Sequence, residues 1–231
     1  MTEIIVLYDN RASGELRPGW GFSAFIRTEG AAIMLDAGAD EMVLEHNAKQ
    51  LGANLESVVA LVLSHDHCDH VGAMRSVFHK GLHLYVPKAF AKRLATVRRS
   101  GIDLHVVEKP VDIVPSVRSI GQMGRAIPEQ ALLIDGVDGP VLITGCAHMG
   151  IAKLVKRATE LAGEPMELIL GGFHLFRENA AAIDRVIDDL RKLGVQRVGA
   201  CHCTGDVAIS AMREAFGENF VETEAGTRIE V

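Results

Sequence analysis

The sequence has no long apolar run and no run of basic residues. No stretch approaches the ~20 consecutive apolar residues that a membrane-spanning helix requires, so we expect no membrane segment. The chain also lacks the charged start, apolar core and small-residue cleavage site of a signal peptide. Acidic residues outnumber basic ones by 30 to 24, which gives a net charge of −6. Without a basic stripe, nucleic acid is excluded as an expected partner, and we expect a small-molecule substrate.

Cysteine is scarce, and its placement excludes a secreted disulfide scaffold. The four cysteines, at positions 68, 146, 201 and 203, lie inside or beside histidine-bearing segments, whereas a disulfide framework would spread them through loops. This pattern predicts a protein of the reducing cytoplasm. We interpret Cys146, Cys201 and Cys203 as small buried hydrophobic groups rather than metal ligands.

The length and composition predict one ordinary globular domain. A chain of 231 residues, 48% hydrophobic and 23% charged, is long enough to bury a large core. No shift in composition and no linker divides it, so we expect residues 1–231 to form a single domain. Strand-like runs dominate the first half and strand–helix alternation the second, which predicts a mixed α/β class. The sequence carries no signal for the oligomeric state.

Apolar periodicity and turn residues predict the individual elements. We expect strands at residues 3–8, 21–27, 31–35, 58–63, 82–86, 131–134, 141–144, 167–170 and 195–200, and one or two within 219–230. We expect helices at residues 40–50, 71–80, 89–99, 151–161, 179–193 and 206–216. Prolines and glycines interrupt residues 101–128, which predicts either short strands or a flap over the active site.

The segment 64–70, Ser-His-Asp-His-Cys-Asp-His, carries the strongest chemical signal. It directly follows the apolar run 58–63, so its side chains lie at the end of a predicted buried strand. Imidazole and carboxylate groups are the ligands that zinc and similar metals prefer. His65 and His67 alternate and can point to one side, while Asp69 and His70 can face a second ion. A loop of solvated histidines is the alternative, and the density of metal-type groups argues against it.

Three later strands also end at a histidine. His148 follows the run 141–144, His174 follows 168–170, and His202 follows 198–200. Strand ends that carry ligands at one edge of a sheet can complete a shared metal site.

The pattern His65-x-His67-x-Asp69-His70 resembles the signature of the metallo-β-lactamase superfamily of metal-dependent hydrolases. The resemblance implies a four-layer αββα sandwich, in which two sheets face each other and helices cover them. It also implies two sets of metal ligands: His65, His67 and His148 for one ion, and Asp69, His70 and His202 for a second.

One departure concerns the third ligand-bearing strand. Superfamily members usually carry an aspartate that bridges both ions there, but this strand continues as Gly171-Gly172-Phe173-His174. His174 is therefore either a metal ligand or a catalytic acid or hydrogen-bond donor toward substrate; a purely structural histidine is the third alternative.

Several motifs together resemble one branch of the superfamily. They are Tyr8-Asp9-Asn10, Thr144-Gly145-Cys146-x-His148, Gly171-Gly172-Phe173-His174-Leu175 and His202-Cys203-Thr204-Gly205. This combination is similar to hydrolases related to the 7,8-dihydropterin-6-methyl-4-(β-D-ribofuranosyl)aminobenzene-5′-phosphate synthase of methanopterin biosynthesis. Cys68, in place of an aromatic residue, and Ala73, in place of a second glycine, are local departures from the pattern.

Two aspartates are candidates to support the ligands. Asp36 ends a predicted strand in an Asp-x-Gly turn, where its carboxylate can orient a ligand histidine through the free ring nitrogen. An ordinary turn aspartate is the alternative. Asp66 is interpreted as a hydrogen-bonding turn residue, with a general base as the alternative.

Four residues are candidates for substrate binding. Asn10 and Trp20 lie on the loop that we expect over the site, where Trp20 can stack on a flat substrate such as a pterin or simply fill the core. Thr204 and Gly205 open a predicted helix, whose free N–H groups attract a phosphate or carboxylate.

These expectations combine into a metal-assisted hydrolase acting on a small ester or related compound, phosphorylated or not. An ion held by three histidines activates a water for hydrolysis, and Asp69 is placed to hold the proton. Zinc is expected first, with manganese or iron as alternatives. One rival function is a transferase that joins a pterin diphosphate to an arylamine ribose phosphate. The others are a flavodiiron-type redox site, which would need more acidic ligands and a flavin domain, and a non-catalytic metal-dependent binding protein.

Overall fold

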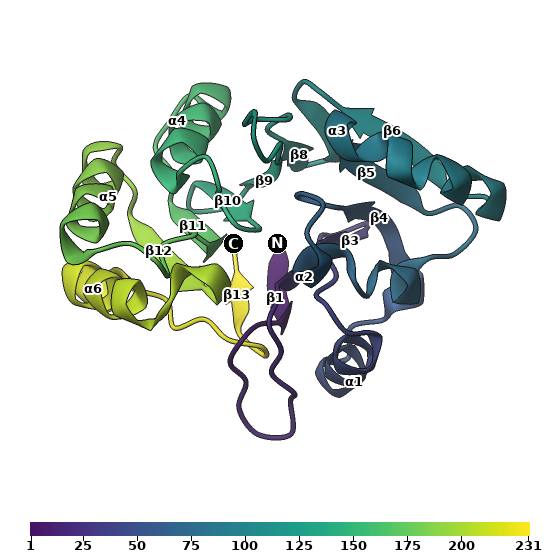
Figure 1. Cartoon of the computed structure of the whole chain (residues 1–231), viewed down its shortest axis with the longest axis horizontal. Helices are drawn as coiled ribbons and strands as arrows, with labels where there is room; N and C mark the ends of the chain where they lie inside the picture. The colour runs from purple at the N-terminus through teal and green to yellow at the C-terminus, as the bar shows by residue number, and fades with distance from the viewer.

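The computed structural model describes the backbone of residues 1–231 and all side chains except those of Ala95, Arg98 and Arg99. Its strands form two sheets (Figure 1). The first sheet has the order β13-β1-β2-β3-β4-β5-β6 and the second β12-β11-β10-β9-β8-β7. The first contains β1 (Glu3–Tyr8), β2 (Ser23–Arg27), β3 (Ala32–Leu35), β4 (Val58–Val62), β5 (His83–Pro87), β6 (Asp103–Val107) and β13 (Arg228–Glu230). The second contains β7 (Val111–Val114), β8 (Val117–Ser119), β9 (Ala131–Asp135), β10 (Pro140–Thr144), β11 (Leu168–Gly172) and β12 (Arg197–Cys201).

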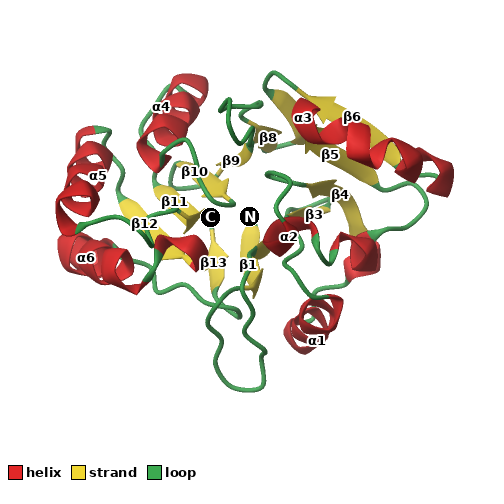
Figure 2. Ribbon diagram, viewed as in Figure 1, coloured by secondary structure: helices red, strands yellow, loops and turns green.

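Helices lie on the two outer sides of the sheets (Figure 2). They are α1 (Glu41–Leu51), α2 (Cys68–Val71), α3 (Lys88–Ala91), α4 (Ile151–Ala162), α5 (Ala180–Lys192) and α6 (Asp206–Phe216), with 3-10 turns at Leu55–Ser57, Met74–Val77, Lys92–Ser100, His202–Thr204 and Gly217–Asn219. Among the described residues, none of the helices is both long and apolar enough to cross a bilayer.

Three apolar cores separate four layers. Successive strand residues point to opposite faces of a sheet, so Leu61 joins the outer core with Leu44 of α1, while Val62 joins the core between the sheets. In the second sheet, Ile143 faces the same middle core and Leu142 faces the core under α4, α5 and α6. The layers therefore run helix, sheet, sheet, helix, which confirms the predicted αββα sandwich.

Most predicted elements are confirmed within a few residues. The first strand matches its predicted range, and α1 begins after Asp40, whose side chain accepts a hydrogen bond from Val43 N at 3.1 Å. Gly52 ends α1 in a left-handed conformation (φ 69°), as its position predicted. The irregular stretch 101–128 contains the three short strands β6, β7 and β8.

Two predicted helices are wrong. The helix expected at 71–80 is replaced by α2, which begins inside the histidine motif, and by a 3-10 turn at Met74–Val77. Gly72 passes so close to the Ala39 carbonyl that a Cβ on it would lie 2.2 Å from that oxygen, so the chain bends toward β3 there. The helix expected at 89–99 is the short α3 followed by the 3-10 segment Lys92–Ser100.

The carboxyl ends of β3, β4, β10, β11 and β12 bring the candidate site residues together. Within each sheet these strands are parallel, so the segments that follow them emerge at one edge. Gln130 ties the two sheets at this edge: its side chain donates to Leu63 O at 2.9 Å and Tyr85 O at 3.2 Å, and its backbone N–H donates to Ser64 O at 2.9 Å. These hydrogen bonds hold the segment before β9 of the second sheet against the ends of β4 and β5 in the first sheet.

Candidate metal centre

Four turns aim the candidate ligands inward. Asp36, Ala147, His174 and His202 have φ between 48° and 57°, a left-handed conformation that residues other than glycine seldom adopt. Each follows one of the strands that end at the site. Such strain is retained where the surrounding structure over-determines it, and it gathers at functional sites.

The first donor group contains His65, His67 and His148, one ligand atom from each lying within 4.8 Å of the others. His65 Nε2 lies 3.1 Å from His67 Nδ1, and the rings of His65 and His148 are 4.6 Å apart. The other nitrogen of His65, Nδ1, faces Ser64 Oγ at 2.9 Å, so Nε2 is the atom turned toward the group.

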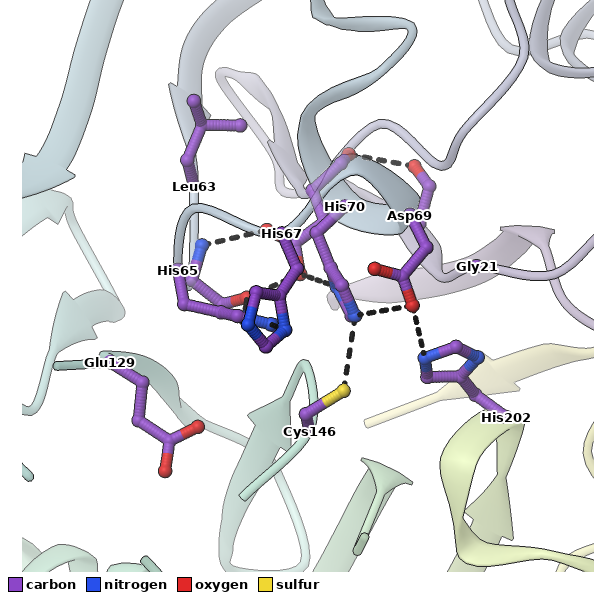
Figure 3. A network of polar contacts seen from close by, with 12 residues as sticks. Gly21, Leu63, His65, His67, Asp69, His70, Glu129, Cys146 and His202 are labelled. Carbon is purple, nitrogen blue, oxygen red and sulfur yellow. Dashed lines mark hydrogen bonds and ion pairs between the residues drawn. The ribbon is translucent and has the colours of Figure 1, made fainter. Parts of the chain in front are cut away.

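The second donor group contains Asp69, His70 and His202 (Figure 3). Asp69 Oδ2 lies 3.7 Å from His70 Nε2 and 3.4 Å from His202 Nε2. Zinc bonds to nitrogen and oxygen at tetrahedral angles separate neighbouring donors by about 3.3–3.6 Å. The spacing of this group therefore fits one small divalent ion.

Two buried imidazole nitrogens in the donor groups make no hydrogen bond. Among the described side chains, His148 Nε2 and His202 Nε2 are fully shielded and make no hydrogen bond. Buried polar atoms are nearly always satisfied, and an imidazole nitrogen without a proton is a good metal ligand. The residues present thus fit a metal ion at each group.

The protonation states also suit metal binding. Burial, reinforced by the neighbouring histidines, holds the pKa of His65 far below its usual value, so its ring is neutral. Burial alone would raise the pKa of Asp69, but the contacts from His202 and His70 outweigh it and bring that pKa well below the usual range. Neutral imidazole and ionised carboxylate are the forms that bind metals.

Buried carboxylates hold one ligand in each group. Asp36 Oδ2 lies 2.7 Å from His70 Nδ1, and Asp36 also accepts hydrogen bonds from Ser64 N and Ser64 Oγ, both at 2.6 Å. Glu129 Oε2 lies 3.2 Å from His148 Nδ1, and Glu129 Oε1 accepts from Met149 N at 3.0 Å. Each contact leaves the Nε2 atom of its histidine facing the site, the usual arrangement around a metal ligand.

Sequence similarity agrees with this geometry. The family described as the metallo-beta-lactamase superfamily matches residues 16–155, more than half of the chain. The chain belongs to the metallo-beta-lactamase superfamily. Membership implies a divalent metal at a site built as this one is.

One relative by sequence and one solved structure each align with nearly the whole chain. The chain is 25% identical, over 269 aligned positions and 93% of its length, to the 7,8-dihydropterin-6-methyl-4-(beta-D-ribofuranosyl)-aminobenzene-5'-phosphate synthase of Methanocaldococcus jannaschii, of which 92% is covered. The solved structure of Tm1679, a metal-dependent hydrolase of the beta-lactamase superfamily, superposes with a TM-score of 0.84 at 23% identity, covering 100% of this chain and 99% of that one.

A more distant structure shares the fold. Zn(2+)-bound PqqB from Methylobacterium extorquens superposes with a TM-score of 0.64 at 13% identity, covering 99% of this chain and 100% of that one. The predicted superfamily and branch are confirmed by these matches.

Three residues that we expected to bind substrate contact other parts of the protein. Asn10, expected to bind substrate, contacts His202: its Oδ1 lies 3.0 Å from His202 Nδ1, and its Nδ2 donates to His202 O at 3.0 Å. Thr204, expected to bind an anion, is fully buried and its hydroxyl accepts from Phe173 N at 3.0 Å. Gly205 is pressed against Phe176, where a Cβ would lie 2.7 Å from Phe176 Cα. All three residues make contacts within the protein, and substrate binding by them stays a prediction.

Asp66 and Trp20 lie at the margin of the site. Asp66 pairs with Arg93 at 2.5 Å and belongs to neither donor group, which fits a turn residue better than a general base. Trp20 is 52% exposed, so it is not core filling; its ring lies 5.1 Å from that of His202 and 5.9 Å from that of Phe176. It forms part of an aromatic wall beside the second donor group.

His174 lies at the open side of the site. Its side chain is exposed, and its ring is 4.5 Å from the ring of His148 and 5.3 Å from that of Phe176. A side-chain contact with Cys203 raises the pKa of His174. This position excludes a buried structural role and places the ring beside the first donor group.

Two supporting residues were not predicted from the sequence. Glu129 stands at the end of the irregular stretch, where no periodic pattern marks it as buried. Asp9, which accepts from His202 N at 2.9 Å, is likewise fully buried. The only signal for Asp9 was its place in the motif Tyr8-Asp9-Asn10, which we had used for the resemblance alone.

Proposed function

We propose that this protein is a metal-dependent hydrolase that cleaves small esters with a metal-activated water. The observation that carries the proposal is the pair of adjacent donor groups, which include the buried Nε2 atoms of His148 and His202 that make no hydrogen bond. His65, His67 and His148 would hold one ion and Asp69, His70 and His202 the other. Bound there, the metal would lower the pKa of a water toward ~7 and polarise the substrate. We propose zinc first, with manganese and iron as alternatives.

The protein's own groups would handle protons and orientation. Asp69, ionised and part of the second donor group, is placed to hold a proton from the attacking water. His174, exposed beside His148, is placed to donate a proton to a leaving group. Glu129 and Asp36 fix the rings of His148 and His70, so that each presents Nε2 to the site.

Features around the opening favour an anionic substrate with a flat part. The Arg177 guanidinium lies over the ring of Phe176 at 5.1 Å. The exposed ring of Trp20 offers a stacking surface near His202. A phosphorylated or carboxylated aromatic ester meets both features, and we propose such a small molecule, met in the cytoplasm, rather than nucleic acid.

The test is hydrolysis of 4-nitrophenyl phosphate, bis(4-nitrophenyl) phosphate and 4-nitrophenyl acetate by zinc-, manganese- and iron-loaded protein. We expect turnover of at least one ester. The double substitution His65→Ala/His67→Ala should lower it by about 100-fold or more, since losing hydrogen-bond partners of metal ligands alone costs 10- to 100-fold. His83→Ala, an exposed histidine of β5, is the matched control. Equal turnover by the double variant would overturn the proposal, and ligand binding without turnover would favour a non-catalytic binding protein.

A second candidate is a transferase that joins a pterin diphosphate to an arylamine ribose phosphate. The 25% identity to the Methanocaldococcus jannaschii synthase over most of the chain favours it, as does the stacking surface of Trp20. The alignment spans more positions than this chain has residues, so the relative contains insertions that this protein lacks. Because this chain lacks those insertions of the synthase, we place hydrolysis ahead of the transferase reaction. Mass spectrometry separates the two: pyrophosphate release with a new C–N bond supports the transferase, and release of the hydrolysed pterin supports the hydrolase.

A further inference from the structure

A cysteine occupies the space between the two donor groups. Superfamily members usually place a carboxylate there, at the end of the strand that corresponds to β11, and this chain has none between that strand and Glu178. We infer that Cys146 is a thiolate ligand of the ion held by Asp69, His70 and His202. The inference rests on the metal centre proposed above, but not on the reaction. It also reverses our interpretation of Cys146 as a mere buried hydrophobic group.

The position of the sulfur supports this assignment. Cys146 Sγ lies 3.1 Å from His70 Nε2 (Figure 3), while the other nitrogen of that ring, Nδ1, contacts Asp36 at 2.7 Å. Among the described residues, Cys146 shares a possible ion site with His65 and His70, another with His202 and Cys203, and a third with His148 and His174. No other residue takes part in as many of these groups. The thiol is therefore central to the cluster.

The local sequence forces the sulfur into this place. Gly145 packs so tightly against the end of β4 that a Cβ would lie 2.2 Å from Ser64 Oγ and 2.7 Å from Asp36 Oδ2. Ala147 then takes a left-handed turn with φ 54°. The tight approach and the turn bring Cys146 to His70 and leave it 3% exposed.

Charge and chemistry point the same way. Two divalent ions in this site would face a single ligand carboxylate, that of Asp69, if the thiol stayed neutral. Binding releases the Cys146 proton to solvent and adds one negative charge. Aspartate, two histidines and a thiolate form a four-donor set that suits tetrahedral zinc, and the soft sulfur disfavours manganese.

The neighbouring Cys203 has a different role. Its thiol donates to Cys146 Sγ at 3.2 Å, a contact that orients the Cys146 sulfur. Cys203 shares a group with His202 and Cys146, but none with His70 or Asp69. We assign it as a positioning residue.

The first measurement uses the native protein. Zinc X-ray absorption should show a sulfur neighbour at about 2.3 Å, the usual zinc–thiolate distance. A zinc shell of nitrogen and oxygen only, in protein whose thiols titrate as free, would overturn the inference. Oxidation of Cys146 and Cys203 to a disulfide in the zinc-loaded protein would overturn it too, because a disulfide sulfur cannot serve as the thiolate.

Cobalt-substituted variants then assign the sulfur. The native protein should show an intense near-ultraviolet thiolate-to-cobalt band that Cys146→Ser loses, while zinc affinity at one of the two sites falls by roughly 100-fold or more. Cys201→Ser, an equally buried cysteine outside every candidate group, and Cys203→Ser should keep the band. Retention of the band in Cys146→Ser with its loss in Cys203→Ser would overturn the assignment. If hydrolysis fails while the sulfur signal is present, the proposed function fails and this inference stands. If the protein hydrolyses an ester while neither of its two bound metals has a sulfur ligand, this inference fails and the proposed function stands.

Discussion

The side-chain amide of Asn10 contacts both the ring and the backbone carbonyl of His202, although the two residues lie 192 positions apart in the chain. Asn10 Oδ1 lies 3.0 Å from His202 Nδ1, and Asn10 Nδ2 donates to His202 O at 3.0 Å. Because an Nδ1 proton is used in this contact, His202 Nε2 is left as a lone pair toward Asp69. Asn10, on the loop after β1, therefore orients His202, the residue that the turn after β12 adds to Asp69 and His70 in the second donor group.

Asn10→Ala should weaken metal binding at the second group by about 10- to 100-fold, because the His202 ring loses its orienting partner. The affinity is measured by competition with a chromophoric chelator. Asn219→Ala, an exposed asparagine, is the control and should bind metal as the native protein does. Unchanged affinity in Asn10→Ala would show that the backbone alone positions His202.

Glu129→Gln should lower kcat by about 10- to 100-fold, since the first donor group loses the carboxylate that orients His148. The amide still accepts the hydrogen bond from Met149 N, so the fold should persist. Steady-state kinetics on the zinc-loaded protein provides the measurement, with the exposed Glu164→Gln as control. Equal kcat values for native and Glu129→Gln protein would refute the role.

Gly145→Ala should lower the free energy of unfolding by about 1–3 kcal/mol, because the new methyl group overlaps Ser64 Oγ and Asp36 Oδ2. Urea denaturation of the metal-free protein measures the loss. Gly30→Ala is the matched control: its Cβ meets no atom within 4 Å, and its φ is not left-handed. If both variants were equally stable, the close approach of β10 to β4 at this point would be wrong.

The metal-free protein should lose stability as the pH falls below about 6.5, the ordinary pKa of histidine. Burial lowers the pKa of His65, reinforced by His70, His148 and His67, so the ring stays neutral in the folded chain and is protonated in the unfolded one. The unfolded state then binds more protons, and stability decreases toward acid. His65→Gln should show a smaller decrease between pH 6.5 and 5, measured by urea denaturation, than native or His83→Gln protein. Equal slopes for all three would contradict the lowered pKa.

The sequence predicted the frame of the site well, because the signals were local. An apolar run that ends at His65 fixes both a buried strand and the position of the first ligands, and three later runs end at His148, His174 and His202 in the same way. Periodicity also predicted α1, α4, α5 and α6 within a few residues. The sandwich itself came from the resemblance of the histidine motif, since periodicity alone indicates only a mixed α/β class.

The rest depends on contacts between segments far apart in the chain. In the sequence, nothing distinguishes Glu129 from other acidic residues in irregular stretches. Only the fold shows that this residue, just before β9, lies next to His148. Asn10 and Thr204 were recognised as residues near the site, but a polar residue type does not show whether its partner is a substrate or the backbone. Cys146 is a related case: burial of a cysteine at a strand end is common, and only the fold reveals that its sulfur lies 3.1 Å from His70 Nε2.

The most direct test of the metal centre is a crystal structure of zinc-replete protein with anomalous data collected on both sides of the zinc absorption edge. We expect two anomalous peaks, one among His65, His67 and His148 and the other among Asp69, His70 and His202. Absence of density at both positions, in crystals of protein shown to carry zinc, would contradict this expectation.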